Sequence, residues 1–100
     1  MLESVYEEAL CIELAERKIP FARQASVDLS YKGRHIGKGR LDLLIGDAVI
    51  VELKAVEKLD EVHQAQLITY LKLTGRRLGL LVNFNVPVLK QGIKRLVMSK

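Results

Sequence analysis

The sequence predicts an α/β fold in which a mixed β-sheet is flanked by helices. Two segments have the spacing of amphipathic helices, residues 2–18 and from Asp60 to about Thr74. Three strand-like segments lie between them, and a fourth follows the second helix. The second helix is a crossover, so the fourth strand should pair parallel to a strand already in the sheet. The expected order is therefore helix, three strands, helix, strand.

The first helix is predicted by apolar residues at near-helical spacing among Glu and Lys, from Leu2 to Leu14. Pro20 ends it, because proline cannot continue a helix. Cys11 lies on the apolar face, so we expect it to be a buried structural thiol. As the only cysteine, it excludes an internal disulfide and any cysteine-cluster metal site.

Three strands follow, at residues 23–31, 35–45 and 48–56. The first alternates apolar and polar residues as a half-buried strand does, and Lys32-Gly33 turns the chain after it. The next two are apolar runs joined at Gly46-Asp47. Because consecutive strands with short connections pair antiparallel, these three should form a meander.

The second helix has recognisable signals at both ends. Leu59 is an apolar residue before the N-cap Asp60, and Gly75 stands where a left-handed residue ends a helix. Residues 77–84 then read as a buried strand, and residues 93–98 as a short edge strand.

Length and composition favour a single domain over residues 1–100 with one modest core, since 49% of the residues are hydrophobic. The N-terminus has no basic segment followed by an apolar one, and no long apolar run occurs. We therefore expect neither a secretion signal nor a membrane partner, and a cytoplasmic location.

The formal charge of +4 suits a polyanionic partner such as nucleic acid. The basic residues gather in three clusters: Lys32, Arg34, Lys38 and Arg40; Arg76 and Arg77; and Lys90, Lys94, Arg95 and Lys100. Together they could form a surface that tracks phosphates, although solvated loops and strand ends explain them equally well.

Charged residues stand inside the two central apolar strands. Asp42 lies in one strand, and Glu52 and Lys54 lie in the next. Acidic and basic residues are depleted from strands, and burying an unpaired charge is costly. Two carboxylates and an ammonium at one point of a sheet suit binding of a divalent cation and activation of water. An edge strand whose polar face meets water is the alternative explanation.

Strand register decides whether the two carboxylates meet. A two-residue turn at Gly46-Asp47 would pair Asp42 with Val51 and place its carboxylate on the face away from Glu52. A shared site therefore requires a three- or five-residue loop, or a bulge. Without metal, repulsion within such a site should raise the pKa of at least one carboxylate, with partial relief from Lys54.

One stripe of the second helix mixes hydrogen-bonding and apolar side chains: Leu59, Val62, His63, Gln66, Tyr70 and Leu73. Satisfied polar groups in the core, with Tyr70 reaching outward, explain this pattern without a function. His63 has no second histidine at ligand spacing, so we expect it to be partner-bonded or exposed. His35, in a basic segment, is expected to be solvated.

Asp42, Glu52-x-Lys54 and the downstream Gln66-x-x-x-Tyr70 resemble the motifs of the PD-(D/E)XK nuclease superfamily, whose core has the helix and strand order given above. Nearly the entire chain is similar to the GxxExxY family of small nuclease-like proteins, in the segments Leu2–Glu7, Val51–Val56, Ala65–Leu67, Thr69–Lys72 and Gly79–Phe84. The resemblance implies a restriction-endonuclease-like fold.

The resemblance also implies a Mg²⁺ or Mn²⁺ site formed by Asp42, Glu52 and the carbonyl of Leu53. The metal would activate a water and neutralise the phosphate. Lys54 would orient that water or stabilise developing charge.

Further site residues implied by the resemblance come from the two helices. Gln66 and Tyr70 would position the metal shell or the nucleic-acid backbone. Glu3, or Glu7 one turn later, would bring another carboxylate, while ordinary first-turn acids favoured by the helix dipole are an equal alternative.

The sequence departs from the GxxExxY pattern in two places. The glycine of the motif would fall immediately before Met1, so only Glu3 and Tyr6 of that motif are present and we expect a leading segment to be missing. Asn85 stands where the family tends to have glycine, and asparagine tolerates the left-handed region better than most residues.

The resulting prediction is a metal-dependent nuclease that hydrolyses phosphodiester bonds, with DNA favoured over RNA. The main alternative is a nucleic-acid-binding or protein-interaction module that keeps the fold without cleaving. A carboxylate-pair hydrolase acting on sugars is a distant third, disfavoured by Lys54 and the absence of Trp. A homodimer is left open.

Overall fold

The computed structural model describes residues 2–99. Its elements are α1 (Leu2–Glu16), β1 (Phe21–Tyr31), β2 (Arg34–Ile45), β3 (Val49–Lys54), α2 (Glu61–Thr74), β4 (Leu78–Asn83), the short 3-10 helix η1 (Leu89–Gly92) and β5 (Ile93–Val97). The predicted order is confirmed, and no predicted boundary differs by more than two residues. None of the helices within residues 2–99 has the length and apolar character needed to cross a membrane.

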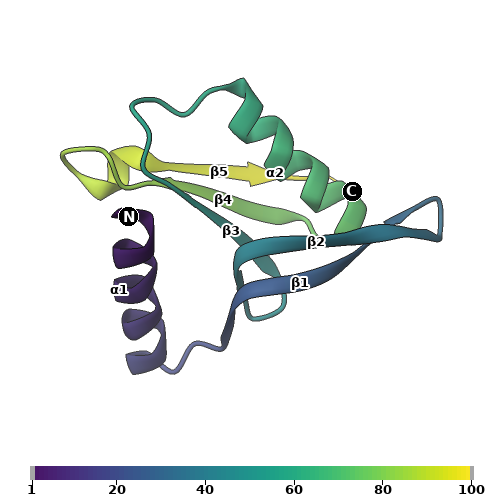
Figure 1. Cartoon of the computed structure of the whole chain (residues 1–100), viewed down its shortest axis with the longest axis horizontal. Helices are drawn as coiled ribbons and strands as arrows, with labels where there is room; N and C mark the ends of the chain where they lie inside the picture. Colours follow the sequence, from purple (N-terminus) through teal and green to yellow (C-terminus); the bar gives the residue numbers. More distant parts are fainter. Residues whose placement is uncertain (1, 100) are drawn as a thin grey trace.

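The five strands form one sheet in the order β1-β2-β3-β4-β5. The first three strands pair antiparallel, β4 pairs parallel to β3 after the α2 crossover, and β5 pairs antiparallel to β4. Figure 1 shows the two helices on opposite sides of this sheet. The predicted mixed sheet is therefore confirmed, and β3 lies at its centre.

Each face of the sheet has its own hydrophobic core. The core on the α2 side consists of Val27, Leu41, Leu44, Ile50, Leu67, Leu71 and Leu81. The core on the α1 side consists of Cys11, Leu43, Val51, Leu53 and Val82. Strand β3 shows how the pattern arises, because successive side chains of a strand alternate between faces. By this alternation, Glu52 and Lys54 share the α2 face with Ile50.

Cys11 is buried at 5% exposure, as predicted for a structural thiol. Burial raises the pKa of this thiol, so it stays in the poorly reactive protonated form. Lys18 adopts a left-handed φ of 58° shortly after the end of α1, which explains why the helix stops before the predicted residue 18.

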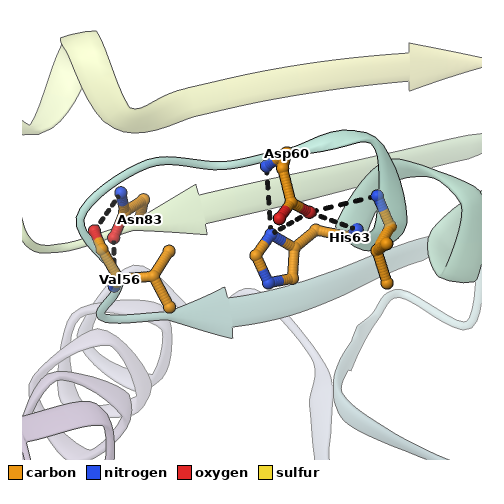
Figure 2. Close-up of polar contacts among 5 residues, drawn as sticks. Val56, Asp60, His63 and Asn83 are labelled. Atoms are coloured by element: carbon orange, nitrogen blue, oxygen red, sulfur yellow. Dashed lines mark hydrogen bonds and ion pairs between the residues drawn. The ribbon is translucent and has the colours of Figure 1, made fainter.

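Both ends of α2 have the predicted caps. The Asp60 carboxylate accepts the backbone N–H groups of Val62 and His63, while the Asp60 N–H donates to His63 Nδ1 at 3.1 Å (Figure 2). His63 Nδ1 also lies 3.2 Å from the Asp60 carboxylate. Gly75 ends the helix with a φ of 73°. His63 is thus partner-bonded, as expected.

The face of α2 that packs on the sheet differs from the predicted stripe. The buried residues are Leu67 and Leu71, whereas Val62 of the stripe is 62% exposed. At about 100° per residue, the buried face is rotated by roughly a quarter turn from the stripe. Gly79 on β4 permits this packing, since a Cβ there would lie 2.9 Å from the Leu67 side chain. The stripe therefore lies beside the core and not within it.

Candidate metal and catalytic site

A three-residue loop sets the register of the two acidic strands. Ile45 pairs with Val49, and Leu43 pairs with Val51, so the connection consists of Gly46, Asp47 and Ala48. Continuing the same register places Asp42 opposite Glu52. The prediction of a loop longer than two residues is confirmed, and Glu52 belongs to the α2 face of the sheet.

Carboxylate hydrogen bonds replace the strand ladder at this point. The β2–β3 pairing ends at Leu43 and Val51. Beyond it, the Asp42 N–H donates to Glu52 Oε2 at 3.2 Å, and the Leu53 N–H donates to Asp42 Oδ2 at 2.8 Å. Each carboxylate thus has one oxygen bound to the opposite strand. Asp42 Oδ1 and Glu52 Oε1 bond to none of the described residues, and neither is sealed from solvent.

The strand on the other side of Asp42 is also irregular. Pairing between β1 and β2 passes from Arg23–Leu43 to Ala25–Leu41, and Gln24 lies between them with a φ of 46°. Left-handed backbone is unfavourable for a residue with a side chain, and such strain often accompanies functional sites. The Gln24 side chain donates to Glu7 at 3.0 Å, which helps to hold this conformation. Asp42 therefore sits where the sheet departs from regular pairing on both sides.

Glu52 has a strongly perturbed acidity. Burial, followed by repulsion from Asp42, raises its pKa from 4.5 to about 7, while the Asp42 N–H and Lys54 act in the opposite direction. The expected repulsion and the relief by Lys54 are both present, but desolvation is the larger cause. A half-buried carboxylate that titrates near neutrality is typical of a functional site, although ion-pair networks also produce such shifts.

The segment that follows Glu52 is fixed by three neighbours. The Lys54 carbonyl accepts the N–H of Phe84 at 2.8 Å. The Ala55 N–H donates to Glu3 at 3.2 Å. The side chain of Asn83 both accepts the Val56 N–H, at 3.0 Å, and donates to the Val56 carbonyl, at 2.8 Å (Figure 2). Lys54 is thereby held on a defined backbone beside the carboxylate pair.

Sequence reasoning gave no role to Asn83, which is only 3% exposed. It is the one polar or charged side chain buried among residues 2–99, and buried amides need hydrogen-bond partners. Its position at the end of the apolar strand β4 was the available signal. The amide acts as a substitute peptide group that extends the β3–β4 pairing to Val56.

The structure separates the two α1 carboxylates that the sequence left open. Glu7 accepts hydrogen bonds from Arg23, at 3.2 Å, and from Gln24. Glu3 is exposed and reaches the strand end through the Ala55 N–H. Only Glu3 therefore contacts the segment that carries Lys54, and it does so through the backbone.

Gln66 and Tyr70 lie on the same side of the sheet as Glu52. All three line a cleft of about 550 Å³ between α2 and the sheet. Gln66 is exposed, and Tyr70 is half-buried. The Tyr70 ring lies against β2 at Gly39, where a Cβ would come within 2.6 Å of the ring. Tyr70 thus depends on a glycine opposite it, and the role of Gln66 and Tyr70 in positioning the metal shell or the nucleic-acid backbone stays a prediction.

The donor set fits a hard divalent cation that keeps several waters. Mg²⁺ is commonly bound by one or two carboxylates together with water. Asp42 and Glu52 supply two free oxygens from adjacent strands, and Leu53 lies between Glu52 and Lys54 on the same strand. Within residues 2–99, no third His, Cys, Asp or Glu joins a metal-binding group. The site is therefore a two-carboxylate site in which water would supply most remaining ligands.

The three predicted basic clusters do not form one continuous free surface. Arg76 is paired with Asp47 at 2.7 Å, and Arg77 donates to the carbonyl of Met98. Lys38 and His35 both contact Asp28, so His35 is exposed but not simply solvated. Lys100 lies outside the described residues.

One residue of the C-terminal cluster shares the face of Glu52. Lys94 pairs with Leu81, which belongs to the core on the α2 side. Directly opposite residues of an antiparallel pair lie on one face, so Lys94 is on the α2 face, whereas its neighbour Arg95 is on the α1 face. Because Glu52 also pairs with Leu81, Lys94 and Glu52 flank the same β4 residue.

Comparison with known proteins agrees with this fold. A family model for the PD-(D/E)XK nuclease superfamily matches residues 1–96. The crystal structure of SSO0001 is similar with a TM-score of 0.69 and 20% identity, over 96% of this chain and 50% of that one. An alkaline exonuclease (LHK-Exo) from Laribacter hongkongensis is similar with a TM-score of 0.64 and 16% identity, over 96% and 56%. The chain thus spans about half the length of these structures. No curated protein matches it.

Proposed function

Since the chain belongs to the PD-(D/E)XK nuclease superfamily, we propose that it is a divalent-metal-dependent nuclease that hydrolyses phosphodiester bonds, with DNA favoured over RNA. The observation that supports this proposal most directly is the Asp42–Glu52 pair, in which each carboxylate accepts one backbone N–H of the opposite strand and keeps a free oxygen. We further propose membership of the GxxExxY family, a single domain over residues 1–100, and action in the cytoplasm.

In this proposal, Asp42, Glu52 and the Leu53 carbonyl hold Mg²⁺ or Mn²⁺. When bound, the ion lowers the pKa of coordinated water and neutralises phosphate charge. Glu52 must lose its proton to serve as a ligand, and its pKa of about 7 places that loss near neutral pH. The Asp42 N–H and the Leu53 N–H orient the two carboxylates before any substrate arrives.

Lys54 follows Glu52 on the same face and supplies positive charge to the reacting phosphate. A preorganised ammonium stabilises the charge that develops on the phosphate oxygens in the transition state. Glu3 and Asn83 hold the residues after this strand through hydrogen bonds to Ala55 and Val56. Gln66 and Tyr70 line the adjoining cleft and position the substrate chain.

A non-cleaving nucleic-acid-binding or interaction module is the second candidate, and one observation favours it. The carboxylate pair has no third acidic partner within residues 2–99. Because a protonated Glu52 cannot hold a cation, a site with this pKa is weak at neutral pH unless substrate phosphate adds ligands. A homodimer, or another partner that contributes further groups, would complete such a site.

The test is cleavage of end-labelled single- and double-stranded DNA and RNA with Mg²⁺, Mn²⁺ or EDTA. We expect metal-dependent cleavage by the wild-type chain and loss of it in Glu52→Gln. Glu57→Gln is the matched control, because Glu57 is an exposed carboxylate in the loop that follows β3. Binding without cleavage under every metal condition would favour the module, and absence of both would reject the nucleic-acid proposal.

A further inference from the structure

The cleft that Glu52 lines is long and mostly apolar, and phosphodiester hydrolysis does not itself require such a cleft. It follows α2 from Val62 to Leu73, a distance of roughly 16 Å at about 1.5 Å per residue. Its volume of about 550 Å³ lies within the range of small-molecule sites. The cleft therefore has room for a nucleotide-sized group whose phosphate lies at Glu52.

The cleft walls are apolar and carry no positive charge. Most of the lining residues are apolar or aromatic, and Gln66 and Thr69 add an amide and a hydroxyl; the former are Leu29, Val62, Ala65, Tyr70 and Leu73. Neither Lys nor Arg lines it among the described residues. A phosphate entering it would lose water without gaining a cation. A nucleobase suits it better, because a base has apolar faces and hydrogen-bonding edges.

Two features make the lining suited to stacking. The Tyr70 ring is confined by the backbone of β2 at Gly39, where a Cβ would lie 2.6 Å from it, so little side-chain freedom remains to be lost on binding. Val62 is 62% exposed on an otherwise amphipathic helix, so a base in the cleft would bury apolar surface that the fold leaves in water. Aromatic side chains are the usual platforms for unpaired bases.

We infer that this cleft binds an unpaired nucleobase next to the phosphate held at the carboxylate pair, so that the substrate is single-stranded or locally unpaired nucleic acid. The inference rests on the proposed function in taking nucleic acid as the ligand. In a duplex, the base must first leave its stack and its pairing partner, which costs several-fold in affinity or more. Single strands avoid this cost.

The test measures binding with Mg²⁺ present in the Lys54→Ala background, which should not cleave but should keep its affinity, so that the cation needed to hold the phosphate is in place. Oligonucleotides carry 2-aminopurine, an abasic position at successive sites, or a complementary strand, in DNA and RNA forms. We expect quenching of 2-aminopurine on binding, about five-fold or greater loss of affinity at one abasic position, and weaker binding of the duplex. Val62→Ser should weaken binding several-fold. Val5→Ser is the control, because Val5 is a helical valine of nearly equal exposure, 63%, outside the cleft.

The outcomes separate this inference from the proposed function. Equal affinity for abasic and intact strands, or equal effects of Val62→Ser and Val5→Ser, would overturn the base-binding cleft even if the protein cleaves DNA. Base-dependent binding together with no cleavage under any metal would reject the nuclease and retain the cleft. Duplex that binds as tightly as single strand would also overturn the inference.

Discussion

At the scale of single residues, Glu52 is a carboxylate that is both partly buried and close to a second carboxylate. Each of these properties disfavours its charged form. It is a half-buried acid in a central strand, and a neighbouring acid raises its pKa further. A purely structural position would be filled better by an apolar residue, because burying this carboxylate next to Asp42 opposes folding. The fold tolerates the pair by giving each carboxylate one backbone N–H donor. Such a cost is the reason to assign a function to these residues.

The raised pKa of Glu52 predicts the pH dependence of stability in EDTA. The folded chain keeps the proton up to about pH 7, whereas in the unfolded chain the group titrates near 4.5. The free energy of unfolding should therefore fall as pH rises from about 4.5 to 7 and change little above that. The loss should be on the order of 1–3 kcal/mol.

Urea unfolding at several pH values between 4 and 8 measures this effect. Glu52→Gln should abolish the decline and be more stable than the wild type at pH 8, while Glu57→Gln should retain the wild-type slope. Parallel curves for wild type and Glu52→Gln would show that the pKa of Glu52 is not raised. The pKa would then no longer support a functional site at this position.

Asn83 provides the second prediction at this scale. Asn83→Ala leaves the N–H and carbonyl of Val56 without their side-chain partners, which should cost about 1–3 kcal/mol of stability. Hydrogen exchange at the Val56 N–H should accelerate more than the global change explains. The control is Asn85→Ala, because the Asn85 side chain is exposed and Asn85 contributes only a backbone N–H. Unchanged exchange at Val56 would contradict the assigned role.

At the scale of elements, α2 determines what surrounds the site. Its caps at Asp60 and Gly75 could be read from the sequence because capping depends on local residues. Its orientation could not, because the helix carries two candidate faces and periodicity does not tell which one meets the sheet. Gly79 and Gly39 decide this, by admitting Leu67 and Tyr70 respectively. Both contacts are between residues distant in sequence.

Strand β5 provides a prediction through the alternation of its side chains. Lys94 lies on the face of Glu52 and Arg95 on the opposite face. Lys94→Ala should weaken nucleic-acid binding similarly for all sequences and reduce its salt slope by roughly one unit. Arg95→Ala, an adjacent loss of the same charge, should change neither.

Lys54→Ala should show the converse behaviour, with cleavage lost and affinity and salt slope nearly unchanged. Salt-titrated binding and single-turnover cleavage of the three variants provide the measurements. If Arg95→Ala and Lys94→Ala had equal effects, the α2 face would not be the binding surface.

At the scale of the whole molecule, the sheet gathers residues that are far apart in the chain. The element order and a parallel pairing after the crossover helix followed from strand patterns, which are encoded locally. The meeting of Asp42 with Glu52 depended on the length of the β2–β3 loop, which the sequence left open. The pairing of Arg76 with Asp47 and the attachment of Arg77 to the C-terminal strand end did not follow from strand patterns. Those contacts depend on which loops and strand ends lie side by side in the folded sheet. Charge clusters in a sequence therefore overstate the free positive surface.

The central claim is that Asp42 and Glu52 form a divalent-cation site, and paramagnetic line broadening by Mn²⁺ tests it without requiring catalysis. Substoichiometric Mn²⁺ at pH 8 should broaden the amide signals of Asp42, Glu52 and Leu53 first, and excess Mg²⁺ should restore them. The effect should disappear in Glu52→Gln and persist in Glu57→Gln. Broadening centred on the exposed acids of α1, or unchanged in Glu52→Gln, would contradict the claim.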